Sequence, residues 1–250
     1  MCSSTATSTP SVRDRSEPVR RPLGRAAPLG APVLIVNLKA YPTALGPGAL
    51  RIGRALEELG RSADVDVAIA PSAPDLALLA TSLRIPVLAQ QVDASPPGAR
   101  TGRTVVESLR AAGVRGSLVN HSECPEPTGK VPAIVSRLSK AGLAAVVCAG
   151  DLRTAGQLAR SRPQYLAIEP PELIGGDRAV SSARPEIVSG AVERVRRVSR
   201  RTLVLCGAGV HDRHDVRRAL ELGSQGVLVA SAVALARRPR RAILELLAGF

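Results

Sequence analysis

Three ionisable side chains each stand at the end of a short apolar run. Lys39 closes the run VLIVNLK, His121 closes GSLVNH, and Glu169 lies near the end of YLAIEP. An ammonium, an imidazole and a carboxylate at one site can move a proton and stabilise the negative charge that develops as it moves. The three residues therefore favour proton-transfer chemistry, provided that the chain brings the ends of these runs together.

Two further apolar runs end in small residues. TLVLCGAG ends with Gly207 and Gly209, and GVLVAS ends with Ala230 and Ser231, which lead into a short helix. Backbone N–H groups exposed at such turns suit a phosphate dianion. We therefore expect an anion clamp beside the proton-transfer residues.

Each of these residues also has a structural interpretation. Lys39 fits a surface position, His121 and Glu169 could serve as structural hydrogen-bonding groups, and the glycines fit ordinary turns. The other two histidines, His211 and His214, lie in a polar helix entry and are expected to be solvated. No metal-ligand spacing exists, and we expect no metal and no cofactor.

The elements that would position the site alternate in type. Eight Val-, Leu- and Ile-rich runs without strict alternation are typical of strands buried on both faces of a parallel sheet. Between them lie segments with helical periodicity, several of which end in glycine. The order predicts a single α/β domain, a (β/α)₈ barrel over residues 33–250, with its site at the carboxyl ends of the strands. The alternative is an open doubly wound sheet, but the first turn, NLKAYPTALGPG, lacks the G-x-G-x-x-G motif of that fold. The eight runs cover residues 33–39, 65–70, 86–91, 116–121, 143–149, 165–170, 202–209 and 226–231.

Residues 1–32 differ in composition from the remainder. They are rich in Ser, Pro and Arg and have no apolar periodicity, which predicts a disordered extension rather than a secretory signal.

The formal net charge of the chain is +13, an excess that favours anionic partners. With no Trp, two Tyr and one Phe, the chain lacks the aromatic platforms typical of nucleic-acid binding, so that partner is not expected. The absence of an 18-residue apolar run predicts no membrane span, and the four dispersed cysteines suit reduced thiols in the cytoplasm. Cys148 and Cys206 lie inside apolar runs and are expected to be core residues.

Five blocks carry a resemblance to a known family. NLK, NHSE, AIEPPELIG, CGAG and GVLVAS occur in unbroken order, and they resemble the triosephosphate isomerases, most of all the compact archaeal-type enzymes. The resemblance covers about residues 33–250. It implies a TIM barrel and the interconversion of dihydroxyacetone phosphate and glyceraldehyde 3-phosphate.

The resemblance also implies residue roles. Glu169 would be the base, and His121 would be the neutral electrophile; this family is itself the standard example of that pairing. Asn37 and Lys39 would act on the substrate oxygens, and Glu123 would be buried near Lys39. Glu172 would belong to the loop and not to the catalytic set. The residues expected to bind substrate are Asn37, Leu38, Lys39, Ile174, Gly175, Gly209, Ala230 and Ser231.

Two departures from the family pattern keep alternatives open. Gly175-Gly176-Asp177 stands where the family usually has Gly-Thr-Gly, and CPEPTGK (124–130) is irregular. A related isomerase or epimerase of another phosphorylated keto sugar is therefore the second hypothesis. A non-catalytic, basic nucleic-acid-binding barrel is the third. The segment SPPGARTG (95–102) resembles the family loop that reaches a partner subunit, which implies a homo-oligomer, a tetramer being favoured over a dimer.

Overall fold

The computed structural model describes residues 29–176 and 178–250. Residues 1–28, which make up most of the expected extension, and Asp177 lie outside the described residues. The described chain forms an eight-stranded sheet whose strand ladders are parallel and whose order is β2-β1-β8-β7-β6-β5-β4-β3. A parallel bridge between Ile69, in β2, and Val87, just before β3, joins the two ends of that order. The expected (β/α)₈ barrel is therefore confirmed.

Each expected apolar run contains one strand. The strands are buried except at their first residues Asp66, Ala144 and Leu203, because one face of each strand packs inside the barrel and the other packs against helices. The strands are β1 Val33–Asn37, β2 Asp66–Ala70, β3 Leu88–Ala89, β4 Gly116–Val119, β5 Ala144–Ala149, β6 Tyr165–Ile168, β7 Leu203–Cys206 and β8 Gly226–Val229.

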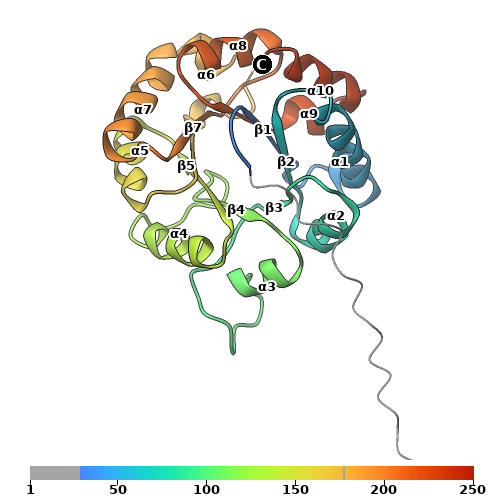
Figure 1. The fold of residues 1–250 in the computed structure, drawn as a ribbon, viewed down its shortest axis with the longest axis vertical. Helices are drawn as coiled ribbons and strands as arrows, with labels where there is room; N and C mark the ends of the chain where they lie inside the picture. Colours follow the sequence, from blue (N-terminus) through green and yellow to red (C-terminus); the bar gives the residue numbers. More distant parts are fainter. Residues whose placement is uncertain (1–28, 177) are drawn as a thin grey trace, which may run out of the picture.

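Helices surround the strands as a ring (Figure 1). Eight of the ten α-helices fall within or close to the segments of helical periodicity, α9 is the short helix expected after Ser231, and α6 had no clear signal in the sequence. The α-helices are α1 Pro47–Gly60, α2 Leu76–Ser82, α3 Val106–Ala111, α4 Val131–Lys140, α5 Leu152–Leu158, α6 Val180–Ala183, α7 Pro185–Val198, α8 Arg213–Glu221, α9 Ser231–Ala234 and α10 Pro239–Leu247. The 3₁₀ helices are η1 Pro42–Ala44, η2 Ala73–Asp75, η3 Ala159–Ser161 and η4 Pro171–Leu173.

The core has two layers. Alternate strand residues such as Ile35, Leu118 and Leu205 fill the barrel interior, while their neighbours, such as Leu34 and Val204, pack under the helices. Cys148 and Cys206 are buried, one in each layer, as expected from their apolar surroundings. The interior is thus a packed core, and ligands have access only to the two ends of the barrel.

The two ends of the barrel differ in which ends of the strands they present. The C-terminal mouth is the end at which the strands finish, and the N-terminal mouth is the end at which they begin. At the N-terminal mouth the side chain of Leu29 packs into the inner core. The Tyr165 hydroxyl donates to the Gly30 carbonyl at 2.6 Å, and the Gln164 amide donates to the Leu29 carbonyl at 2.7 Å. The contacts of the barrel therefore begin at Leu29, four residues before β1.

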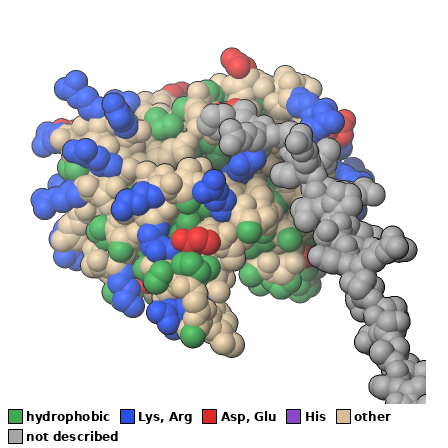
Figure 2. Space-filling model, turned by 60° about the horizontal axis from the view of Figure 1, so that its bottom comes forward, with side chains coloured by type: hydrophobic (Ala, Val, Ile, Leu, Met, Phe, Trp, Pro, Cys, Tyr) green, Lys and Arg blue, Asp and Glu red, His purple; other side chains and the backbone are tan. Residues whose placement is uncertain are grey.

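The surface is basic but not uniformly so. Figure 2 shows one side on which Lys and Arg side chains are scattered among uncharged ones, with few carboxylates. None of the helices in the described part of the chain is long and apolar enough to span a membrane.

Candidate active site

One pocket at the C-terminal mouth collects almost all of the expected site residues. It is lined from the ends of β1, β4, β6, β7 and β8, as expected if parallel strands deliver their last residues to one end of a barrel. Leu38 is the exception, because its side chain is fully buried in the outer core. The expected residues that line the pocket are Asn37, Lys39, His121, Glu169, Ile174, Gly175, Gly209, Ala230 and Ser231.

Lys39 is held by its backbone as well as by its side chain. Its φ is +50°, a left-handed conformation that is uncommon for a residue other than glycine and is typical of functional sites. Its N–H donates to Asn37 Oδ1 at 3.0 Å, and its carbonyl accepts from the Gln90 amide at 3.0 Å. These two bonds offset the conformational cost and fix the direction in which the lysine leaves the strand.

The expectation that Glu123 is buried is wrong. Lys39 Nζ donates to Glu123 Oε1 at 2.6 Å, so the two residues are neighbours as the resemblance implied, but the Glu123 side chain is 56% exposed. Glu123 lies beyond the end of β4, on the turn outside the mouth, where solvent reaches it from one side. The Lys39 side chain is only 12% exposed, so the ion pair positions the lysine at the edge of the pocket.

The hydrogen bonding of His121 assigns the ring proton. The backbone N–H of Glu123 donates to His121 Nδ1 at 3.1 Å. Because a backbone N–H can only donate, Nδ1 must carry a lone pair, and the ring proton then sits on Nε2. The imidazole is 5% exposed and lines the pocket. It is therefore a neutral donor, which is the form that can polarise a carbonyl oxygen.

Glu169 occupies a space that glycine makes. A Cβ on Gly207 would lie 2.7 Å from Glu169 Oε1 and 2.8 Å from its Cδ, and it would overlap the Cγ of that side chain. The carboxylate is 7% exposed, and its Oε2 is buried without a hydrogen-bond partner among the described residues. Burial raises the pKa of the neighbouring Cys148 thiol well above its usual value, and the Glu169 charge adds to that shift. The buried Glu169 carboxylate therefore lies beside a thiol that stays protonated.

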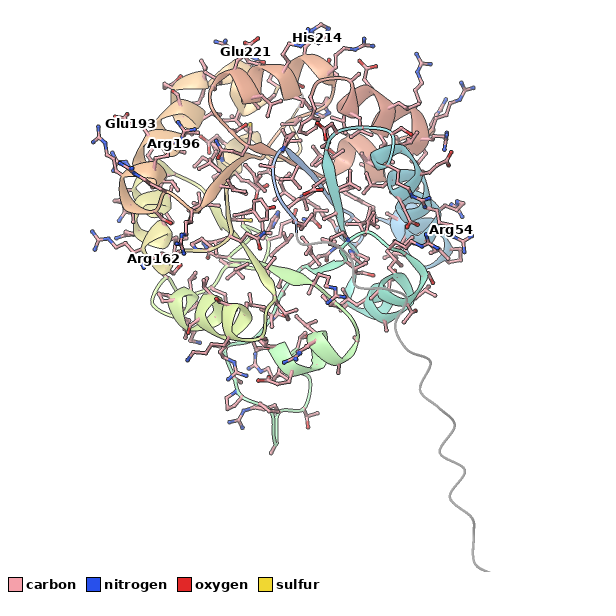
Figure 3. The ribbon with its side chains drawn as sticks, in the orientation of Figure 1. Arg54, Arg162, Glu193, Arg196, His214 and Glu221 are labelled. Atoms are coloured by element: carbon pink, nitrogen blue, oxygen red, sulfur yellow. The ribbon has the colours of Figure 1, made fainter. Side chains whose placement is uncertain are left out.

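A flap covers this carboxylate; the term denotes the segment from Pro170 to Gly176. Its tip contributes Ile174 and Gly175 to the pocket lining. His211 contacts the flap, since its Nε2 lies 2.9 Å from the Gly176 carbonyl oxygen. The expectation that His211 is solvated is therefore wrong, whereas His214 is exposed at the outer edge of α8, as expected (Figure 3). Sequence periodicity missed this because His211 precedes α8 on the turn that faces the flap.

The residues expected to form the anion clamp lie in the same pocket. Gly209, Ala230 and Ser231 line the pocket, and Ser231 opens α9. Gly209 has a φ of +68°, and a Cβ there would collide with the carbonyl oxygen of Arg178. Only glycine allows the turn after β7 to lie this close to the residue that follows the flap.

Two contributors were absent from the expected set. Tyr41 lines the pocket although it stands two residues beyond Lys39, because η1 turns the chain back over the mouth. Gln90 holds the strained Lys39 backbone. Both had a weak signal in the sequence, since one is among only two tyrosines and the other is a polar residue at the end of an apolar run.

Metal chemistry has no support in the described part of the chain. No group of three or more His, Cys, Asp or Glu side chains there could hold an ion. The polar side chains that line the pocket are instead one ammonium, one imidazole, one carboxylate, one amide and two hydroxyls, which belong to Lys39, His121, Glu169, Asn37, Tyr41 and Ser231.

Comparison with known proteins identifies the family of the chain. The family model of triosephosphate isomerase matches residues 32–246. A triosephosphate isomerase from Methanopyrus kandleri is 44% identical over 223 residues, which are 88% of this chain and 99% of the relative. Those from Methanosarcina acetivorans and Methanothermus fervidus are each 38% identical, over 88% and 86% of this chain and 99% and 97% of the relatives. The resemblance to the archaeal enzymes is thereby confirmed, and the chain belongs to the triosephosphate isomerase family.

Proposed function

We propose that the chain is a triosephosphate isomerase that interconverts dihydroxyacetone phosphate and D-glyceraldehyde 3-phosphate through an enediolate. The observation that carries this assignment is the meeting of Glu169, His121 and Lys39 in one small pocket of a chain of this family. These groups are what a proton shift between two neighbouring carbons requires, namely a base, a donor to the carbonyl oxygen and a positive charge.

The first step is removal of a proton by Glu169. The carboxylate takes the proton from the carbon beside the carbonyl group, and the electron pair of that C–H bond becomes the new C=C bond. The carbonyl π electrons move to oxygen, so an enediolate forms and no co-reactant is needed. Glu169 then returns its proton to the adjacent carbon. Its buried Oε2, which lacks a partner among the described residues, favours transfer because little hydrogen bonding has to be given up.

His121 and Lys39 stabilise the oxyanion. The Nε2–H of the neutral imidazole donates to the oxygen that gains charge, and it can exchange protons between the two oxygens of the enediolate. Lys39 supplies the positive charge, and Glu123 holds its ammonium at the mouth. Charge stabilisation of this kind in a water-poor pocket is usually the largest catalytic contribution.

The flap protects this intermediate. The free space in the pocket is about 30 Å³, so the flap must open before substrate enters. Closure then excludes water, which would otherwise protonate the enediolate, and an enediolate with a free phosphate group could expel it. The tight space favours a three-carbon substrate, whose phosphate we place on the N–H groups of Gly175, Gly209, Ala230 and Ser231.

The decisive experiment is a coupled assay with glyceraldehyde 3-phosphate on Glu169→Gln. Loss of the base is expected to lower kcat by at least about 10³-fold, because proton transfer by a positioned side chain contributes ~10²–10⁴-fold. Glu172→Gln is the matched control, since Glu172 lies three residues away on the flap, is exposed, and pairs with Arg184 at 3.0 Å. It should keep kcat within about twofold of the parent, as exposed ion pairs contribute little.

Wild-type activity in Glu169→Gln, with circular dichroism unchanged, would overturn the proposal. The second hypothesis, a related phosphorylated keto sugar as substrate, rests on Asp177, which lies outside the described residues. A panel of four- to six-carbon sugar phosphates separates the two. A higher kcat/KM on any of them than on glyceraldehyde 3-phosphate would favour the second hypothesis.

Assembly, location and domain limits belong to the same proposal. We place the enzyme in the cytoplasm as a homo-oligomer, with a tetramer favoured over a dimer. The expected limit of the extension at residue 32 moves back to residue 28, because Leu29 and Gly30 contact the barrel. The segment after β3 projects from the ring beside α3 (Figure 1), and its residues 96–103 are exposed, which suits insertion into a partner subunit. Light scattering on the purified chain tests the assembly, and a monomer at micromolar concentration would contradict it.

A further inference from the structure

A second cavity lies at the N-terminal mouth, at the end of the barrel opposite the pocket described above. We call it the arginine hollow and define it by Arg115, Arg162 and Arg201, which line it together with Ser139 and Gln164. Each arginine stands just before a strand, namely β4, β6 and β7 respectively. The cavity measures about 670 Å³, a volume within the ~300–1,000 Å³ typical of small-molecule sites.

The arginines of the hollow have no counter-charge in the described part of the chain. No Asp or Glu of the described residues lines the cavity, and none forms an ion pair with any of the three guanidinium groups. Elsewhere on this surface arginines do find carboxylates, as in the pair of Arg213 with Glu245 at 2.6 Å. Three unpaired cations around one cavity create a local positive potential that an anion would relieve.

Arg162 has a defined backbone position at the rim of the hollow. Its φ is +52°, because it is the left-handed residue that ends η3, and its N–H donates to the Ala159 carbonyl at 3.0 Å. The end of η3 therefore fixes where this arginine leaves the chain. Figure 3 shows Arg162 on the inner side of the helix ring, whereas Arg54 extends outward from α1.

The ends of the helices offer a simpler explanation for the three arginines. The helices of this fold finish near the N-terminal mouth, and basic residues stabilise the negative end of a helix dipole. That explanation accounts for a positive charge near each helix end. It does not account for a cavity of this size beneath the charges, nor for an apolar wall formed by Val135, Leu143 and Pro163.

We propose that the arginine hollow binds a small organic phosphate of nucleotide size. Guanidinium groups suit phosphate oxygens because their N–H groups match them in pairs. The apolar wall would cover the uncharged part of the ligand, which inorganic phosphate lacks. This site is separate from the catalytic pocket and does not depend on the proposed isomerase activity.

Isothermal titration calorimetry of the full chain with ATP tests the proposal. The triple variant Arg115→Gln, Arg162→Gln and Arg201→Gln is expected to weaken ATP binding at least about tenfold, since each charged hydrogen bond contributes ~1.5–3 kcal/mol. The matched control replaces three exposed arginines elsewhere, Arg54, Arg196 and Arg217, with glutamine. It removes the same charge and should leave the affinity for ATP within about twofold, because the arginines of the hollow remain in place. Non-specific attraction, which depends mainly on net charge, would fall equally in both variants.

Two further measurements locate the binding. Saturating triose phosphate in the Glu169→Gln background should not displace ATP, and inorganic phosphate should bind the parent more weakly than ATP does. Undetectable ATP binding, equal losses in the triple variant and its control, or displacement by triose phosphate would each overturn the proposal. If the triple variant fails to fold, Arg162→Gln against Arg54→Gln decides the question with exposed single sites.

Discussion

The C-terminal and N-terminal mouths of the barrel hold their cations in different ways. At the C-terminal mouth Lys39 is 12% exposed, pairs with Glu123 and borders a free space of about 30 Å³. At the N-terminal mouth three arginines without carboxylate partners among the described residues surround about 670 Å³. A catalytic charge must be held in place before the reaction, because its benefit comes from not having to reorganise. A binding site can keep its charges unpaired until the ligand arrives. If both proposals hold, the same barrel separates a reacting end from a binding end.

The largest expected difference is between two variants that each remove one cation, one at the C-terminal mouth and one at the N-terminal mouth. Lys39→Met and Arg162→Met are matched, since each removes one positive charge from a residue with φ near +50°. Lys39→Met is expected to lower kcat/KM by about 10²–10³-fold, the usual loss when one oxyanion-stabilising group is removed. Arg162→Met should leave kcat/KM within about twofold, because it lies at the opposite end of the barrel. Steady-state kinetics on both variants give the answer, and equal losses would refute the division of labour between the two mouths.

The second comparison uses two glycines. Gly226 begins β8 at the N-terminal mouth, where a Cβ would collide with the Val33 carbonyl, and Gly209 follows β7 at the C-terminal mouth, where it would collide with that of Arg178. We expect Gly226→Ala to lower the free energy of unfolding by about 3 kcal/mol through strain and overpacking, without changing KM. Gly209→Ala should also raise KM, because the new methyl group collides with the Arg178 carbonyl and displaces the segment that follows the flap. Urea unfolding and kinetics on both variants separate the effects, and an unchanged KM in Gly209→Ala would mean that the flap tolerates the shift.

The strands were predictable because burial on both faces gives a short, uninterrupted apolar run in the sequence. The run 144–149, for example, is apolar throughout and is β5, and a polar residue after such a run then identifies the mouth. For this reason the sequence alone places Lys39, His121 and Glu169 at one site. The four-residue α6 escaped because one turn of helix has no periodicity to detect.

Other features left no readable signal. The positive φ of Lys39 and of Arg162 could not be read because neither residue is a glycine. Leu29 is a single apolar residue between a proline and a glycine, so no apolar pattern in the sequence predicts that it packs into the inner core. The exposure of Glu123 also depends on tertiary structure, since a resemblance specifies the neighbour of a residue but not how much solvent reaches it.

The third comparison concerns buried and exposed thiols and the pH dependence of stability. Burial raises the pKa of Cys206 from 9.0 to about 12, so the folded state keeps the thiol protonated when the unfolded state already ionises. The stabilisation is complete below the unfolded pKa and is lost as pH rises from there toward the folded value. Between about pH 7.5 and about pH 10.5 this group should reduce the free energy of unfolding by about 2 kcal/mol.

The control for this loss is the exposed Cys124. Cys206→Ala should make stability less sensitive to alkaline pH, while Cys124→Ala should retain the sensitivity of the parent. Guanidinium unfolding at the two pH values measures the difference. The same alkaline loss in both variants would assign it to other groups, of which the buried Cys148 is the first candidate, since burial raises the pKa of its thiol well above the usual value.

The smallest expected effect concerns the flap at the C-terminal mouth. His211 Nε2 and the Gly176 carbonyl are 2.9 Å apart, and this hydrogen bond ties the flap to the turn after β7. A single hydrogen bond contributes about 0.5–1.5 kcal/mol, so His211→Ala is expected to lower kcat/KM by about 2–12-fold through a less populated closed flap. His214→Ala, an exposed change three residues further on, is the control and should have no effect. If both variants match the parent, the flap closes without this bond, and closure must then rest on the contacts that Ile174 and Gly175 make with bound substrate. If His211→Ala alone is slower, the cover belongs to the protein before substrate arrives, which is what a reactive intermediate requires and a simple binding site does not.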